Sequence, residues 1–249
     1  MTKRPPFIVI FLVIIVCFAF GLLNVLIADP EETAPTSVTP FPTQIEATDL
    51  PIQSILIIGV DDLRNIKPQL RAIWVAAYRS SEKIVYLHGL SLDTPIPSNA
   101  AETLQSSFTY SAQTGPGVDF IDGLHEILPL DTTLTIVLDD FTFAAIVDYL
   151  GGIEVSENLL NGESVLALLS IYLDQPTLLL ENQATVVRGL IPKALDQPES
   201  PELTDLFSLV PTHAFLSMDI STTVAKIYSL RETDPDSVFL ILPEDTENP

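Results

Sequence analysis

The stretch SILIIGVDD, residues 54–62, decides the fold. Its first seven residues form a continuous apolar run that ends at a Gly-x-Asp sequence. An unbroken apolar run of this length is typical of a strand that is covered on both faces, with a loop at its carboxyl end. The sequence therefore predicts a first core strand over residues 54–60, followed by a loop that contains Asp61 and Asp62.

Further β-rich runs predict the rest of the sheet. Residues 73–78 and 83–90 are separated by the polar sequence Arg79-Ser80-Ser81-Glu82, which indicates a hairpin. Residues 133–138 and 238–242 predict two more strands.

Helical patterns alternate with these strands. Apolar side chains recur at helical spacing over residues 118–128. Asp140 is expected to cap a helix that runs through residue 150, where Gly151 and Gly152 end it. The remaining helices are expected over residues 162–172, over 177–195 with Pro192 kinking or ending it, and from a cap at Ser221 or Thr222 to residue 230.

Interleaved strands and helices imply one α/β domain over residues 52–245, followed by a short tail at 246–249. We expect a three-layer α-β-α arrangement around a central mixed sheet, because both faces of the first strand must be covered. There is no internal repeat.

The N-terminus carries a long apolar segment, FIVIFLVIIVCFAFGLLNVLIA, at residues 7–28. It contains no charge, and about 22 residues can cross the roughly 30 Å hydrocarbon layer of a bilayer as a helix. Lys3 and Arg4 precede it and acidic residues follow it. The positive-inside rule therefore predicts a single-pass protein of the cell membrane, with residues 1–6 cytoplasmic and the C-terminal domain extracellular.

Two other interpretations of this segment are weaker. A cleaved signal peptide has a shorter apolar core, and Leu26 stands where a small residue is wanted before the cut. A lipoprotein needs a small residue before its modified cysteine, but Val16 precedes Cys17. Residues 29–51, rich in Pro, Thr and acidic side chains, are expected to form an extended linker.

The charge balance excludes one class of partner. The chain has 11 basic and 33 acidic side chains, a net charge of -22, so nucleic acid is not an expected partner. Cys17 is the only cysteine, and the three histidines, His88, His125 and His213, lack the close spacing of a helix-borne metal site.

Several segments together carry a resemblance to a family. They are ILIIGVDDLR (55–64), LDDFTFAAIVDYLGGIEV (138–155), LNGE (160–163) and SMDISTTVAKIYSLRETDPDSVFLILP (217–243). In this order they resemble the LytR-CpsA-Psr proteins of bacterial cell envelopes, over roughly residues 52–245.

The resemblance implies an enzyme outside the membrane that moves a glycopolymer from a polyprenyl-pyrophosphate carrier onto peptidoglycan. It further implies that arginines hold the pyrophosphate, that acidic residues hold Mg²⁺, and that the lipid tail lies in an apolar tunnel. Such groups suit the chemistry, because guanidinium pairs match phosphate oxygens and a divalent cation neutralises charge on the leaving group.

The sequence departs from the family pattern at its charged positions. Where the family has Arg-x-Asp-Thr, this chain keeps Arg71 but has Ile73 in place of a magnesium-binding carboxylate. Where the family has Pro-Arg-Asp-Thr, it keeps Asp93 but has Leu92 in place of an arginine. The arginine-rich stretch of the family falls at residues 169–189, which have no arginine before Arg188 and retain only Asn182-Gln183.

We therefore expect a degenerate member of the family that binds a polyprenyl or other apolar ligand, or a cell-wall partner, and needs no cofactor. The alternatives are an active transferase and an acidic extracellular interaction module. In the active case Asp61 and Asp93 would be catalytic, Asp61 would bind Mg²⁺, and Arg71, Asp62 and Gln183 would bind substrate. Loop capping by the aspartates, an ion pair of Arg71 with one of them, and core packing of Ile73, Trp74, Leu92 and 178–180 are the structural alternatives.

Overall fold

The computed structural model describes residues 53–79, 82–155, 158–195, 212–228 and 233–243. The expected cytoplasmic tail, apolar segment and linker at residues 1–51 lie outside these residues, and so does the tail at 246–249. Within the described part of the chain, no helix is both long and apolar enough to cross a membrane.

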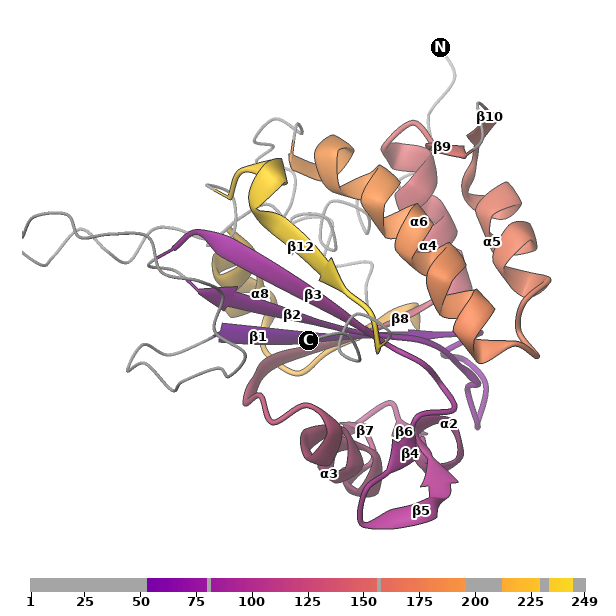
Figure 1. Cartoon of the computed structure of the whole chain (residues 1–249), viewed down its shortest axis with the longest axis vertical. Coiled ribbons are helices and arrows are strands. Elements are labelled where there is room, and N and C mark those ends of the chain that lie inside the picture. Colours follow the sequence, from indigo (N-terminus) through magenta and orange to yellow (C-terminus); the bar gives the residue numbers. More distant parts are fainter. Residues whose placement is uncertain (1–52, 80–81, 156–157, 196–211, 229–232, 244–249) are drawn as a thin grey trace, which may run out of the picture.

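A six-stranded mixed sheet, in the order β11-β8-β1-β2-β3-β12, forms the centre of the molecule (Figure 1). Strand β1 pairs antiparallel with β2 and parallel with β8, while β3 pairs antiparallel with β2 and parallel with β12. The strands are β1 Gln53–Val60, β2 Leu70–Arg79, β3 Ile84–Leu90, β8 Thr132–Asp139, β11 Ala214–Leu216 and β12 Val238–Ile241. All except β11 are predicted by the sequence, and the central mixed sheet is confirmed.

Strand β1 is buried on both faces, as its unbroken apolar sequence predicts. Leu56 and Ile58 are fully buried in a cluster that includes Phe120 of helix α3. Ile55 and Ile57 alternate with them and belong to a second cluster, which includes Ile146 of helix α4. Each face of the sheet therefore has its own hydrophobic core, and each needs a covering layer.

Helices supply both covering layers. Figure 1 shows α4, α5 and α6 over one face of the sheet, and α3 with the short helix α2 over the other. The helices are α2 Leu104–Ser107, α3 Val118–Ile127, α4 Asp140–Tyr149, α5 Gly162–Ser170, α6 Pro176–Leu195 and α8 Ile220–Tyr228. The expected three-layer arrangement is therefore present in the described residues.

Gly162 allows α5 to begin in close contact with α4. A Cβ atom at this position would lie 2.1 Å from the carbonyl oxygen of Ala144, which no side chain tolerates. The Gly162 backbone N–H donates a hydrogen bond of 2.6 Å to Oδ1 of Asp148 on α4. Close packing of α4 against α5 therefore requires a glycine at position 162.

The helix caps correct two sequence expectations. Asp139, not Asp140, caps α4, because its side chain accepts a hydrogen bond from the Thr142 backbone N–H. Asp219 accepts one from the Thr222 N–H, so it takes the role expected of Ser221 or Thr222 at the start of α8. Helix α6 reaches Leu195 as expected and does not end at Pro192, which removes only the hydrogen bond of its own missing N–H.

Short elements complete the described chain. They are β4 Pro95–Ile96, β5 Asn99–Thr103, β6 Tyr110–Ser111, β7 Gly115–Pro116, β9 Ile153–Val155, β10 Asn158–Leu160 and the 3-10 helix Pro235–Ser237. The sequence analysis does not predict them, because two to five residues are too few to show a hydrophobic period.

Candidate functional site: an apolar cavity with a polar mouth

A cavity of about 210 Å³ lies between the sheet and helices α4, α5 and α6. Its walls are mostly apolar and include Ile57, Trp74, Phe143, Leu166 and Val187. Trp74, the only tryptophan of the chain, is 6% exposed. Gly89 on β3 makes room for its ring, since a Cβ atom there would lie 2.9 Å from it.

The sheet topology gathers polar side chains at one end of this cavity. Because β1 and β8 are parallel, Val60 lies beside Asp139, and the antiparallel β2 brings Ala72 beside Gly59 at the same edge. The charged and polar side chains that line the cavity are Arg71, Asp139, Asp140, Ser170 and Gln183. We call this set the polar mouth.

Arg71 and Gln183 come together in the polar mouth, as expected of two substrate-binding candidates. Gln183 is 8% exposed, and its Nε2 donates a hydrogen bond of 2.8 Å to the Arg71 carbonyl oxygen. This bond fixes the amide, so that its Oε1 is the free acceptor. Among the described residues the Arg71 guanidinium has no ion-pair partner, in contrast to the structural ion pair that the sequence left open.

Asp140, in the polar mouth, has a raised pKa. Burial raises its pKa to about 6, and the negative charges of Asp61 and Asp139 act in the same direction. The positive charge of Arg71 opposes this increase but does not cancel it. Asp140 is therefore close to its titration range at neutral pH.

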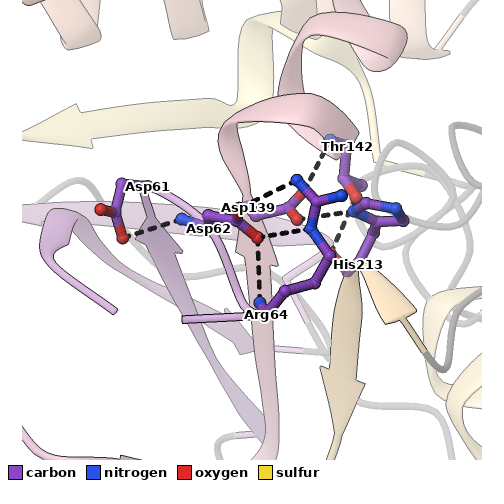
Figure 2. Close-up of polar contacts among 6 residues, drawn as sticks. All are labelled: Asp61, Asp62, Arg64, Asp139, Thr142 and His213. Atoms are coloured by element: carbon purple, nitrogen blue, oxygen red, sulfur yellow. Dashed lines mark hydrogen bonds and ion pairs between the residues drawn. The ribbon is translucent and has the colours of Figure 1, made fainter. Parts of the chain in front are cut away.

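Asp139 and His213 form a pair that the sequence analysis missed (Figure 2). Asp139 is 2% exposed, and its Oδ2 lies 2.7 Å from Nδ1 of His213, while its Oδ1 accepts from the Thr142 N–H. The Thr142 hydroxyl donates to the His213 carbonyl oxygen at 2.8 Å. The pair joins the start of α4 to the chain just before β11. The two residues are 74 positions apart, so no local sequence motif predicts their contact.

Asp61 and Asp62 stabilise the loop that follows β1. Asp61 Oδ1 accepts hydrogen bonds from the backbone N–H groups of Asp62 and Gln69, at 2.8 and 2.7 Å. Asp62 accepts three hydrogen bonds of 2.9 Å from Arg64, two from the guanidinium and one from the backbone N–H, and these lower the pKa of Asp62 to about 2. Neither aspartate lines the cavity. Their contacts match the loop-capping alternative.

Three further positions of the family pattern, Ile73, Leu92 and Asp93, lie apart from the polar mouth. Asp93 is exposed, accepts a hydrogen bond of 2.5 Å from the Ser91 hydroxyl, and does not line the cavity. Ile73 and Leu92 are buried in the cluster that includes Phe120 of α3, and they do not line the cavity either. Trp74 and Leu179, for which the sequence analysis gives core packing as the structural alternative, do line it.

The structure does not bring a cluster of metal-ligating side chains together. Within the described residues, no three His, Cys, Asp or Glu side chains are grouped so that they could hold a metal. Asp61, the residue expected to bind Mg²⁺, accepts hydrogen bonds at Oδ1 from two backbone N–H groups, and both oxygens of Asp139 have hydrogen-bond partners.

Comparisons with known proteins identify the fold. No family model matches the sequence, and no curated protein does. Among solved structures, TagV of B. subtilis is 13% identical with a TM-score of 0.59, covering 77% of this chain and 84% of its own. TagT bound to LIIa-WTA is 16% identical with a TM-score of 0.58, covering 80% and 82%.

A third structure, yvhJ from Bacillus subtilis, described as a transcriptional regulator, is 18% identical with a TM-score of 0.56, covering 77% and 82%. These TM-scores establish a shared fold, whereas sequence identities this low do not establish a shared activity. The described residues of this chain therefore have the LytR-CpsA-Psr fold, as the resemblance of the sequence predicts.

Proposed function

We propose that this protein is a cell-envelope protein that binds a polyprenyl or other apolar ligand, or a cell-wall partner, and does not transfer a glycopolymer. One observation carries the proposal: the cavity is apolar, and Arg71 is the only cationic side chain among the described residues that line it. A pyrophosphate needs several charge-assisted contacts, each worth roughly 1.5–3 kcal/mol. A single guanidinium facing two carboxylates supplies too little.

The placement outside the cell is part of the same proposal. Residues 7–28 are uncharged and follow Lys3 and Arg4, so they would anchor the chain in the cell membrane with the domain outside. A lipid-binding cavity suits a domain that is held near a bilayer. Protease treatment of intact cells tests this placement: we expect the domain to be cleaved and the N-terminal tail to be protected.

Lipid extraction tests the ligand. The full chain, purified in detergent and exchanged into an amphipathic polymer, is extracted with organic solvent and the extract is analysed by mass spectrometry. We expect a co-purifying apolar compound in the wild-type sample. The matched control is Val187→Phe, which places a larger side chain in the cavity wall and should reduce the amount recovered. Equal recovery from both proteins would place the lipid outside the cavity.

The second candidate is an active transferase, favoured by the shared fold with TagT and by the unpaired guanidinium of Arg71 among the described residues. It is tested by incubating the full chain with a polyprenyl-pyrophosphate glycan, Mg²⁺ and a peptidoglycan acceptor. We expect no transfer. Transfer that disappears in both Asp61→Ala and Arg71→Ala, with the fold intact by circular dichroism, would replace the first proposal.

A further inference from the structure

The polar mouth contains three groups that make no hydrogen bond or ion pair with another described residue. They are the guanidinium of Arg71, the carboxylate of Asp140 and Oε1 of Gln183. The first group only donates hydrogen bonds, and the amide oxygen and an ionised carboxylate only accept them. A ligand head that satisfies all three must therefore both donate and accept.

The charges around the mouth disfavour an anionic head. Asp61 and Asp139 are close enough to Asp140 to raise its pKa, whereas Arg71 is the one cation that acts on it. Asp62 and Arg64 neutralise each other, and Asp139 contacts His213. Two carboxylates, those of Asp139 and Asp140, line the cavity together with the single guanidinium of Arg71, so a phosphate ester would enter a negative environment.

A cationic head is disfavoured for a different reason. An ammonium group placed within reach of Asp140 would also approach Arg71, which lines the same mouth and has no ion-pair partner among the described residues. An ammonium group also cannot accept the hydrogen bonds that the guanidinium offers. An uncharged head group avoids repulsion both by the carboxylates and by the Arg71 guanidinium.

The size of the cavity limits the apolar part of the ligand. A cavity of 150 Å³ in another protein holds benzene, so 210 Å³ has room for about eight carbon atoms by proportion. A longer chain would need α5 or α6 to move away from the sheet, or would extend beyond the cavity.

From these observations we infer that the cavity prefers a short apolar group with an uncharged hydroxyl or amide head over the corresponding phosphate ester or amine. The inference rests on the proposed function, because it specifies the ligand of the same cavity. It names a chemical class that neither the fold nor the similar structures imply.

Trp74 provides the measurement. It is the only tryptophan and lines the cavity, so its fluorescence reports occupation directly. The full chain in phospholipid vesicles is titrated at pH 7.5 with 1-octanol, octanamide, octyl phosphate and octylamine, which share one tail. Protein-free vesicles correct for partitioning into lipid. We expect saturable binding of the alcohol and amide at concentrations at least tenfold below those needed for octyl phosphate or octylamine.

Two variants locate the effect. Val187→Phe narrows the cavity, so it should abolish the saturable signal for every head group. Asp140→Asn removes one negative charge and keeps an amide at the same position, so it should shift the affinity ratio towards octyl phosphate by several fold. Circular dichroism verifies that both variants are folded.

The possible outcomes separate the two proposals. Binding of octyl phosphate or octylamine as tight as that of octanol would overturn the preference while supporting an apolar-ligand cavity. An unchanged ratio in Asp140→Asn would also contradict it. If none of the four compounds gives a saturable signal that Val187→Phe removes, both the inference and the proposed ligand-binding function fail.

Discussion

Ile73 shows how the surroundings of a single side chain decide what a substitution at its position can do. It takes the place of a magnesium-binding carboxylate in the family pattern, yet its side chain is fully buried in the cluster that includes Phe120 of α3 and does not line the cavity. Restoring the acid should therefore place an unpaired charge in a hydrophobic core and should not rebuild a metal site.

We expect Ile73→Asp to lower the free energy of unfolding by about 3 kcal/mol or more, and added Mg²⁺ not to restore it. Urea denaturation with and without Mg²⁺ measures both effects. Ile73→Val is the control, with an expected loss of about 0.5–1.5 kcal/mol. Stabilisation of the aspartate variant by Mg²⁺ would show that this position does face a metal site.

Asp140 should make stability depend on pH. Its folded-state pKa of about 6 lies above the ordinary value of an aspartate, so the folded protein binds the proton more tightly than the unfolded chain. The free energy of unfolding of the wild-type protein therefore increases as the pH falls from about 6 towards 4. Above pH 6 the ionised, half-buried carboxylate lowers this free energy. Asp140→Asn removes the penalty.

Denaturation at pH 7.5 and pH 4 tests this linkage. We expect Asp140→Asn to be more stable than wild type by about 1 kcal/mol at pH 7.5, a value reduced by the partial exposure of the side chain, with no difference near pH 4. A pH-independent difference between the two proteins would mean that the carboxyl group is not the titrating group.

The sequence predicts some of the individual residues that line the cavity and misses others. Arg71 and Gln183 are expected as ligand-binding residues and do meet in the polar mouth. Asp139 and His213 are not expected together, because 74 residues separate them and only the pairing of β11 with β8 brings them into contact. Asp93 is expected at the site but does not line the cavity, and its carboxylate accepts a hydrogen bond from the Ser91 hydroxyl.

Among the elements, the α4–α5 pair depends on two glycines with different requirements. Gly162 is required by space, since a Cβ atom would meet the Ala144 carbonyl oxygen. Gly151, just after α4, has a φ of +75° but nothing within 4 Å of a Cβ atom. Glycine is favoured at position 151 only because the backbone there has a positive φ.

Alanine at each position separates the two effects. We expect Gly151→Ala to cost about 1 kcal/mol, the usual penalty for a left-handed conformation. Gly162→Ala should cost at least twice as much, because the backbone of α4 or α5 must move. Thermal denaturation of the two variants gives the comparison, and equal losses would argue against close packing at Gly162.

The sequence predicts long elements better than short ones. The strands β1, β2, β3 and β8 and the helices α3 to α6 have enough residues to show a hydrophobic period. The short hairpin strands β4 to β7 do not, and their pairing depends on the chain around them. Helix α4 is predicted with a one-residue error in its cap, because Asp139 and Asp140 are chemically identical and only the strand end distinguishes them.

For the whole molecule, the net charge of -22 sets a further expectation. Repulsion among like charges destabilises a compact state and is screened by salt. We expect the thermal midpoint of the full chain at pH 7.5 to increase when NaCl is raised from about 0.05 to 0.5 M. The effect should vanish near the isoelectric point of 4.1, and an equal increase there would indicate a cause other than charge repulsion.

The last strand of the sheet has a consequence for biogenesis. β12 is only four residues long and pairs with β3 from Val238 beside Val85 to Ile241 beside His88. During synthesis β3 emerges long before β12, and until β12 is made the outer backbone groups of β3 are free to pair with a strand from another copy. A premature stop before residue 238 would therefore yield an aggregation-prone product.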